Sequence, residues 1–202
     1  MKTLIMAGVL LLLLVGAANG AADDAATRLV ERTAGRMLAT LQAERAAIDR
    51  NPQRINQLVD SILAPHFDFE MITRAAVGRD WNSATPAQQR ALTQAFRETL
   101  VRTYAQALLK YSGQEIIYEA AKPGTRTGTV VVPTQVRGTG GAPAIPIDYR
   151  MHRQGGAWKV YDVIIENVSL IANYRGQFRT TIGRSGIDGL IRELETRNRR
   201  GV

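Results

Sequence analysis

Apolar residues recur at helical spacing through the first half of the chain. The first run covers residues 23–48, and its apolar members are Val30, Met37, Leu38, Leu41 and Ile48. A second run follows Asn51 and Pro52, which suit the N-cap and the first position of a helix. A third, shorter run begins at Phe67 and ends near Gly78. The spacing predicts three amphipathic helices.

The sharpest local signal is a helix start at Thr85. Thr85 and Gln88 match a capping box, and Pro86 stands at the first helical position. The helix predicted from here ends at Gly113 and is about 39 Å long at a rise of about 1.5 Å per residue. Its apolar face consists of Leu92, Phe96, Leu100, Tyr104, Leu108 and Tyr111.

After residue 113 the apolar period changes from helical to alternating. The predicted strands are residues 114–120, 127–136, 145–151 and 157–166. Pro133 places the second strand at a sheet edge or a bulge. The inward positions of the third strand are Ile145, Ile147, Tyr149 and Met151. The fourth strand is apolar on both faces, so we expect it to be central and covered on both sides.

Two more helices close the chain, over residues 170–182 and 187–194, and Ser185 is the expected N-cap of the second. Helices, then strands, then helices predict an α+β fold. We expect a curved antiparallel sheet of about four strands with helices over its concave side. One domain is expected over residues 23–202, with a helical first half (23–113), a sheet (114–166) and closing helices (167–199).

The first 22 residues match a secretory signal. Lys2 supplies a positive start, residues 4–15 are apolar and uncharged, and small residues follow up to Ala22. The apolar run is shorter than the roughly 20 residues that span a bilayer. We expect cleavage after Ala22, with Gly20 as the alternative, and export of the remaining chain.

Composition excludes several kinds of chemistry. The chain has no cysteine and two histidines, so it has no disulfide or thiolate, and we expect no metal. We expect His66 to pack at a helix entry and His152 to be exposed near a turn. The net charge of +8 is dispersed except at residues 197–200, and export argues against nucleic acid as a partner. The positive charge would suit binding to anionic lipid or to an acidic protein, or it would serve only solubility.

Motifs for catalysis are missing from the sequence. Asp148 and Asp162 fall on neighbouring strands, but the outward position of Asp148 favours a solvated charge over proton transfer. Serine has no nucleophile-elbow context, and the glycines at 138–141 lack the pattern of a phosphate loop. The apolar surface between sheet and helices is either an ordinary core or a ligand cavity, and periodicity does not distinguish the two.

Residues 77–88 carry a family resemblance. They resemble the Gly-x-x-Trp-x-x-Ala-Thr-Pro-x-Gln stretch of the MlaC, or toluene-tolerance, family of periplasmic phospholipid-shuttle proteins. The similarity continues in order through residues 96–114, 158–163, 168–178 and 186–190. Asn167 stands where the family commonly has glycine, but asparagine tolerates a positive φ. Asp80 replaces a usual aromatic residue.

The resemblance implies a soluble periplasmic phospholipid carrier, not an enzyme, with a cone-like fold similar to nuclear transport factors. It implies that the acyl chains lie in an apolar cavity and that no cofactor is needed. It also implies two membrane partners, an inner-membrane ABC transporter with an MCE-domain subunit and an outer-membrane lipoprotein–porin complex. Lipid transport between them maintains outer-membrane asymmetry. We expect a monomer that does not bind nucleic acid.

Alternation and helical spacing, rather than family motifs, predict which residues contact the lipid tails. The predicted lining is Leu100, Tyr104, Leu108, Val130, Val132, Ile145, Ile147, Tyr149, Val163, Ile165, Leu170, Tyr174 and Phe178. Core packing is the alternative for each of them. Arg79 and Arg175 are candidates to approach a phosphate, with surface charge as the alternative.

Two other functions remain open at this point. One is an enzyme on a cone-like α+β scaffold, of the ketosteroid-isomerase kind, with Tyr149 and Asp162 as its acids. The other is a binding module or chaperone for exported proteins, which would expose apolar surface in place of an enclosed cavity.

Overall fold

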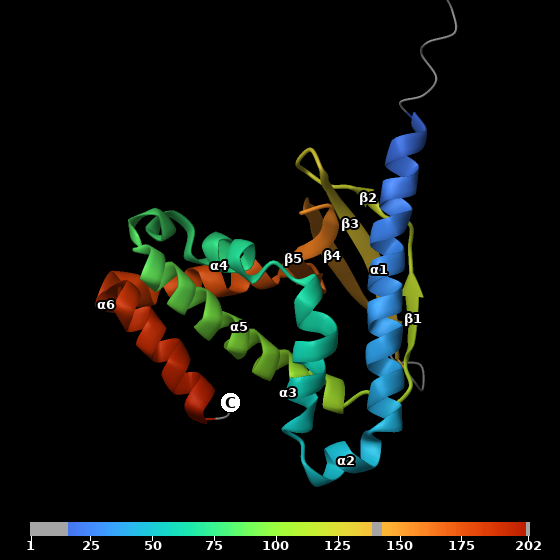
Figure 1. The fold of residues 1–202 in the computed structure, drawn as a ribbon, viewed down its shortest axis with the longest axis horizontal. Helices are drawn as coiled ribbons and strands as arrows, with labels where there is room; N and C mark the ends of the chain where they lie inside the picture. Colours follow the sequence, from blue (N-terminus) through green and yellow to red (C-terminus); the bar gives the residue numbers. More distant parts are fainter. Residues whose placement is uncertain (1–15, 139–142, 201–202) are drawn as a thin grey trace, which may run out of the picture.

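The computed structural model describes residues 16–138 and 143–200, so residues 1–15 of the expected signal lie outside the described residues. Helices come first, then an antiparallel sheet, then a long broken helix (Figure 1). The helical segments are α1 (Gly16–Ala43), α2 (Arg45–Arg50), α3 (Arg54–Leu58), η1 (Val59–Leu63), η2 (Ala64–His66), α4 (Phe69–Val77), η3 (Gly78–Ser83), α5 (Pro86–Leu109) and α6 (Leu170–Arg200). The strands are β1 (Glu115–Tyr118), β2 (Lys122–Pro123), β3 (Thr129–Arg137), β4 (Ile145–Gln154), β5 (Ala157–Ile165) and β6 (Val168–Ser169).

The sheet has the order β1-β3-β4-β5-β6, and β2 pairs with a second part of β3. All of these pairs are antiparallel. The α+β prediction is confirmed, with the two-residue strands β2 and β6 added to the four expected strands. Pro133 lies inside β3, where the β1 ladder ends at Thr134 and the β2 ladder begins at Val131. A proline is tolerated there because neither short strand pairs with it.

A bulge in β5 bends the centre of the sheet. Arg150 pairs with Asp162 and Met151 with Val160, which leaves Tyr161 without a partner on β4. A bulge of this kind increases the local twist and changes which side chains share a face. Val160, Tyr161 and Asp162 are all buried, as expected for a strand that is covered on both sides over part of its length. The expected central position is wrong, because on the side away from β4 the described residues pair with β5 only at the two residues of β6 and at Phe67.

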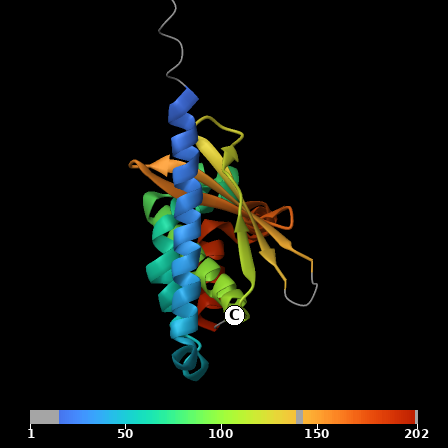
Figure 2. The same cartoon turned by 90° about the vertical axis from the view of Figure 1, so that its right-hand side faces the viewer.

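The helices form two groups around the sheet. Helix α1 crosses one face of the sheet, and α4, α5 and α6 form a separate layer beside it (Figures 1 and 2). Ala26 and Val30 of α1 share a buried cluster with Val132 and Met151 of the sheet. The expectation of helices over the sheet is therefore confirmed, and α1 supplies part of that cover.

A local signal places the start of α5 correctly, although the helix ends at Leu109 and not at the expected Gly113. The capping box of α5 is present, with Gln88 N donating to Thr85 Oγ1 at 3.2 Å and Thr85 N donating to Gln88 Oε1 at 2.9 Å. The first predicted helix is divided after Ala43. Asn51 ends α2 instead of beginning the next helix, since its side chain accepts from Gln53 N and helix α3 starts only at Arg54.

The last helix is broken at Gly186, whose φ of 69° and ψ of −178° are not helical. Two closing helices were expected, and this break separates them. Ser185 does not cap the second one, because its hydroxyl donates to the Thr181 carbonyl oxygen at 2.9 Å. Asn167 adopts a φ of 67° at the corner before α6, as its place at a usual glycine position predicts.

Candidate functional site

A cavity of about 300 Å³ lies between α1, the segment from η1 to α4, the second half of α5 and the strands β4 and β5. It has the size of a small ligand cavity, for which about 300–1,000 Å³ is usual. Eight predicted residues line it, namely Leu100, Tyr104, Leu108, Ile147, Tyr149, Val163, Ile165 and Leu170. Contact of these residues with a lipid stays a prediction.

The other five predicted residues do not line this cavity. Val130 and Val132 are buried between α1 and the sheet, because α1 covers that half of β3. Tyr174 and Phe178 pack edge-on against Phe96, each with 4.8 Å between ring centroids, in the core between α5 and α6. Ile145 begins β4 beyond the reach of the helices and is 42% exposed.

Sequence reasoning missed the contribution of the first helices to the cavity. The unpredicted lining residues are Leu29, Val30, Thr33, Ala34, Val59, Leu63, Ala64, His66, Phe67, Phe69, Ile72, Val101, Ala107, Met151, Val160 and Asp162. The apolar face of α1 could be recognised from the sequence, but periodicity does not show which part of the protein that face covers. The bridge that pairs Phe67 with Val160 is a long-range contact without a local signal.

Polar groups in the cavity wall are few and mostly uncharged. Burial raises the pKa of the Tyr149 hydroxyl to about 12, and burial also raises the pKa of Tyr104. Both phenols therefore remain neutral at ordinary pH. A wall of this kind attracts hydrocarbon and offers little to a charged ligand.

Asp162 is a buried carboxylate that ties three elements together. It accepts from Ser169 Oγ at 2.7 Å, from Ile171 N at 3.2 Å and from the Arg150 guanidinium at 3.2 Å. These donors join β4 and β5 to the start of α6. Tyr149, its partner in the enzyme hypothesis, lies opposite Val163 in the strand register, and no hydrogen bond between Tyr149 and Asp162 is among the described contacts. The geometry therefore gives Asp162 a structural task at this corner.

The two histidines lie near the start of α4, His66 at the end of η2 and His152 against the Asp68 side chain. His152, expected to be exposed, is half-buried, with its Nε2 2.9 Å from Asp68 Oδ2. Asp68 is also the N-cap of α4 and accepts from Met71 N at 2.9 Å. His66 ends η2 and lines the cavity. We expected His66 to pack at a helix entry. Its position in the wall of the cavity was not expected from the sequence.

The two arginines considered for phosphate binding lie away from the cavity. Arg175 donates to the Ala75 carbonyl oxygen from Nε at 3.1 Å and from a terminal nitrogen at 2.9 Å, which joins α6 to α4. Arg79 is exposed in η3. Neither residue lines the cavity, so another set of cations is needed for any anionic group at its mouth.

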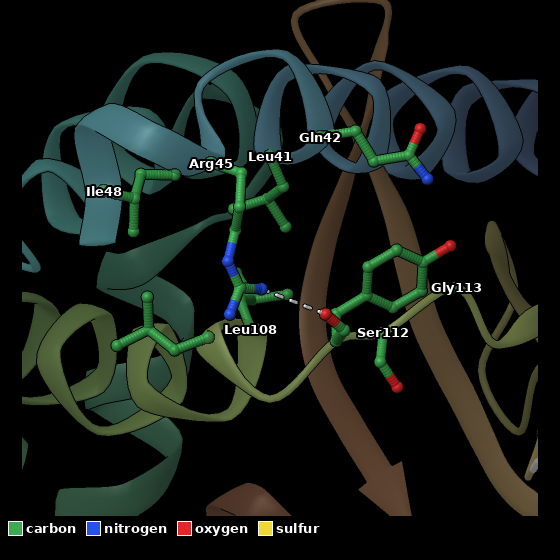
Figure 3. A pocket seen from close by; sticks show the side chains of 9 residues that line it. Leu41, Gln42, Arg45, Ile48, Leu108, Ser112 and Gly113 are labelled. Carbon is green, nitrogen blue, oxygen red and sulfur yellow. Dashed lines mark hydrogen bonds between the residues drawn. The ribbon is translucent and has the colours of Figure 1, made fainter.

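A second hollow, of about 330 Å³, lies where α1 and α2 meet the end of α5 (Figure 3). Its wall contains Leu41, Ile48 and Leu108, and Leu108 also lines the first cavity. Arg45 reaches across it toward the Tyr111 carbonyl oxygen at 3.5 Å and also pairs with Asp49. This hollow is therefore more polar than the first cavity, and Leu108 stands between the two.

Within residues 16–138 and 143–200, no helix is long and apolar enough to cross a bilayer. The same residues contain no group of three or more histidine or carboxylate side chains placed to hold a metal ion.

A helix-covered antiparallel sheet around an apolar hollow defines a class of protein that can enclose a hydrophobic ligand. The model of the family described as MlaC protein matches residues 31–196. The chain therefore belongs to the MlaC family, as its sequence resemblance predicted.

Relatives and a solved structure agree with this assignment. The toluene tolerance protein ttg2D of Pseudomonas putida is 30% identical over 79% of this chain and 74% of its own length. The intermembrane phospholipid transport system binding protein MlaC of Haemophilus influenzae is 26% identical over 83% of this chain and 79% of its own. A phospholipid-binding protein from Ralstonia solanacearum, solved in complex with a phospholipid, has a TM-score of 0.78 and 34% identity, and the match covers 87% of this chain and 97% of that one.

Proposed function

We propose that this protein is a carrier that holds the acyl chains of a phospholipid in the cavity between α1, α5 and β4–β5. The observation that carries the proposal is the apolar cavity itself, whose wall combines leucine, valine and isoleucine side chains with neutral phenols. Each methylene removed from water contributes about 0.8 kcal/mol. A lipid with two tails therefore needs an enclosed aliphatic site for transfer through water. The phospholipid complex of the Ralstonia solanacearum relative supports this reading.

The proposed location of the protein is the periplasm. The expected signal at residues 1–22 supports export, and the Haemophilus influenzae relative bears the name of an intermembrane transport system. The proposed partners are an inner-membrane ABC transporter with an MCE-domain subunit and an outer-membrane lipoprotein–porin complex. A carrier with this function exchanges lipid with both and maintains outer-membrane lipid asymmetry, without being an enzyme and without a cofactor.

Extraction of the native protein tests the proposal. The protein is exported to the periplasm, purified without detergent and extracted with organic solvent, and the extract is quantified by mass spectrometry. About one phospholipid per protein is the expected result. Protein that emerges free of phospholipid would contradict the carrier. Bound unfolded polypeptide in place of lipid would favour the chaperone hypothesis.

A comparison of wild-type protein with one variant separates the carrier from the enzyme hypothesis. Tyr149→Phe keeps the ring that lines the cavity and removes the hydroxyl, so the carrier account expects unchanged lipid content. Chemical alteration of the bound lipid by wild-type protein, lost in Tyr149→Phe, would instead support catalysis.

A further inference from the structure

Positive charges gather beside His66 at the edge of the cavity. His66 ends η2, is half-buried and lines the cavity. Lys159 of β5 donates from Nζ to the carbonyl oxygen of Pro65, the preceding residue. This bond fixes the ammonium group next to the imidazole. The ammonium group is therefore held beside a residue of the cavity wall by a neutral acceptor, and no ion pair with a carboxylate is among its described contacts.

Two arginines approach the same place from α1. Arg32 and Arg36 are one helical turn apart and are both exposed. Between them lie Thr33 and Ala34, which line the cavity. Residues four apart share a helix face, so the two guanidinium groups stand on one side of the helix at the cavity edge.

Lys159, Arg32 and Arg36 all lie near enough to His66 to affect the charge state of its imidazole. Burial lowers the pKa of the His66 imidazole, and the positive charges of Lys159, Arg36 and Arg32 lower it further. Among the described contacts, neither Arg32 nor Arg36 forms an ion pair. The neighbouring Asp68 is already engaged with His152 and with the backbone of α4.

We propose that Arg32, Arg36 and Lys159, beside His66 at the edge of the cavity, bind the phosphate of a lipid whose tails occupy the cavity. This inference rests on the proposed carrier function and names the class of lipid. Three cations exceed the single negative charge of a phosphodiester. The site therefore favours headgroups with a net negative charge, such as phosphatidylglycerol, over phosphatidylethanolamine, whose own ammonium group is repelled.

Lipid exchange from mixed vesicles tests the site. The protein is incubated with excess vesicles of equal phosphatidylglycerol and phosphatidylethanolamine, separated from them and extracted, and the ratio of bound lipids is measured. Wild-type protein is expected to enrich phosphatidylglycerol. The double variant R32Q/R36Q is expected to lower this enrichment about threefold or more, the scale of two partly exposed ion pairs.

The matched control is R90Q/R192Q, which removes two exposed arginines from α5 and α6. It has the same net charge as R32Q/R36Q but leaves the cavity edge intact, so the wild-type enrichment is expected. Equal enrichment in R32Q/R36Q and the control would overturn the headgroup site while leaving the carrier standing. No bound lipid in any of the three proteins would instead contradict the carrier function.

A competition experiment identifies the source of the phosphate. The exchange is repeated with inorganic phosphate at about 10 mM and the ionic strength held constant with sodium chloride. The lipid site predicts unchanged enrichment, because exposed ion pairs alone bind a free anion weakly. Loss of enrichment in phosphate but not in chloride would show a site for free phosphate and overturn the assignment to a lipid headgroup.

Discussion

Ile147 and Ile145 are the same residue type on the same face of β4, but their surroundings differ. Ile147 lies between Thr134 of β3 and Ile165 of β5 and lines the cavity. Ile145 begins the strand and is 42% exposed. The pair therefore offers a change inside the cavity with a matched change outside it, two residues apart.

At Ile147 a lysine is expected to remove lipid. The ammonium group would enter an apolar wall in which the carboxylate of Asp162 is already engaged with the donors of Arg150, Ser169 and Ile171, so lipid tails lose a favourable surface. We expect the bound phospholipid of Ile147→Lys to fall about fivefold or more, measured by extraction and mass spectrometry, with the circular dichroism spectrum unchanged. Ile145→Lys should keep its lipid. A wild-type lipid content in Ile147→Lys would mean that this face of β4 does not contact the ligand.

The buried hydroxyl of Tyr149 should make wild-type protein lose more stability at alkaline pH than the variant Tyr149→Phe. Its pKa is raised to about 12 by burial, whereas an unfolded tyrosine titrates near 10. Between these values the unfolded chain loses the proton first, so ionisation favours unfolding as the pH rises. Relative to Tyr149→Phe, wild-type protein is expected to lose about 1 kcal/mol of unfolding free energy between pH 10 and 12. Urea denaturation at both pH values measures this, and parallel losses in the two proteins would contradict a buried phenol.

At the scale of elements, the corner where β5 meets β6 and α6 depends on one carboxylate. Asp162 accepts hydrogen bonds from Ser169 and Ile171 and pairs with Arg150. Its side chain is 2% exposed. Because buried donors without an acceptor are costly, the connection between sheet and closing helix should weaken when this carboxylate is removed.

Asp162→Ala is expected to lower the free energy of unfolding by about 3 kcal/mol, the scale for breaking a buried charged network. Chemical denaturation measures this change. Asp148→Ala is the control, because Asp148 forms no described ion pair, and a change below about 0.5 kcal/mol is expected there. A neutral effect of Asp162→Ala would show that the corner is held by packing alone.

Elements with local signals were predictable from the sequence. The capping residues Thr85 and Gln88 mark the start of α5, and alternation marks β4, because these patterns depend on neighbours along the chain. The division of α1 from α2 and the start of α3 were not predictable in the same way. There, Asn51 and Pro52 form a turn whose position depends on the packing of both helices.

Part of the cavity wall was also predictable, because helical spacing and strand alternation depend on neighbours along the chain. Tyr104 and Leu108 follow from helical spacing, and Ile147 and Tyr149 from strand alternation. Tyr174 fits the helical spacing equally well, but it packs with Phe96 in the core between α5 and α6. Spacing identifies the apolar face of an element, whereas its partner depends on the tertiary arrangement.

At the scale of the whole molecule, the cavity lies where three cores meet. One core joins α1 to the sheet, one joins α1–α3 to α5, and one joins α4, α5 and α6. Val30, Val101 and Ile72 each belong to a different core, and all three line the cavity. Protein interiors are normally close-packed. A space left between three packed cores therefore supports the proposal that lipid acyl chains occupy it.

Photo-crosslinking tests this explanation most directly. The protein is loaded with a phospholipid that carries a diazirine near the end of one acyl chain, irradiated, digested and mapped by mass spectrometry. The account predicts adducts on the second half of α5 and on β4 and β5, at residues such as Leu108, Ile147 and Val163. Lipid that binds but crosslinks only to exposed helix surfaces, or to Phe96 and Phe178 between α5 and α6, would contradict the account.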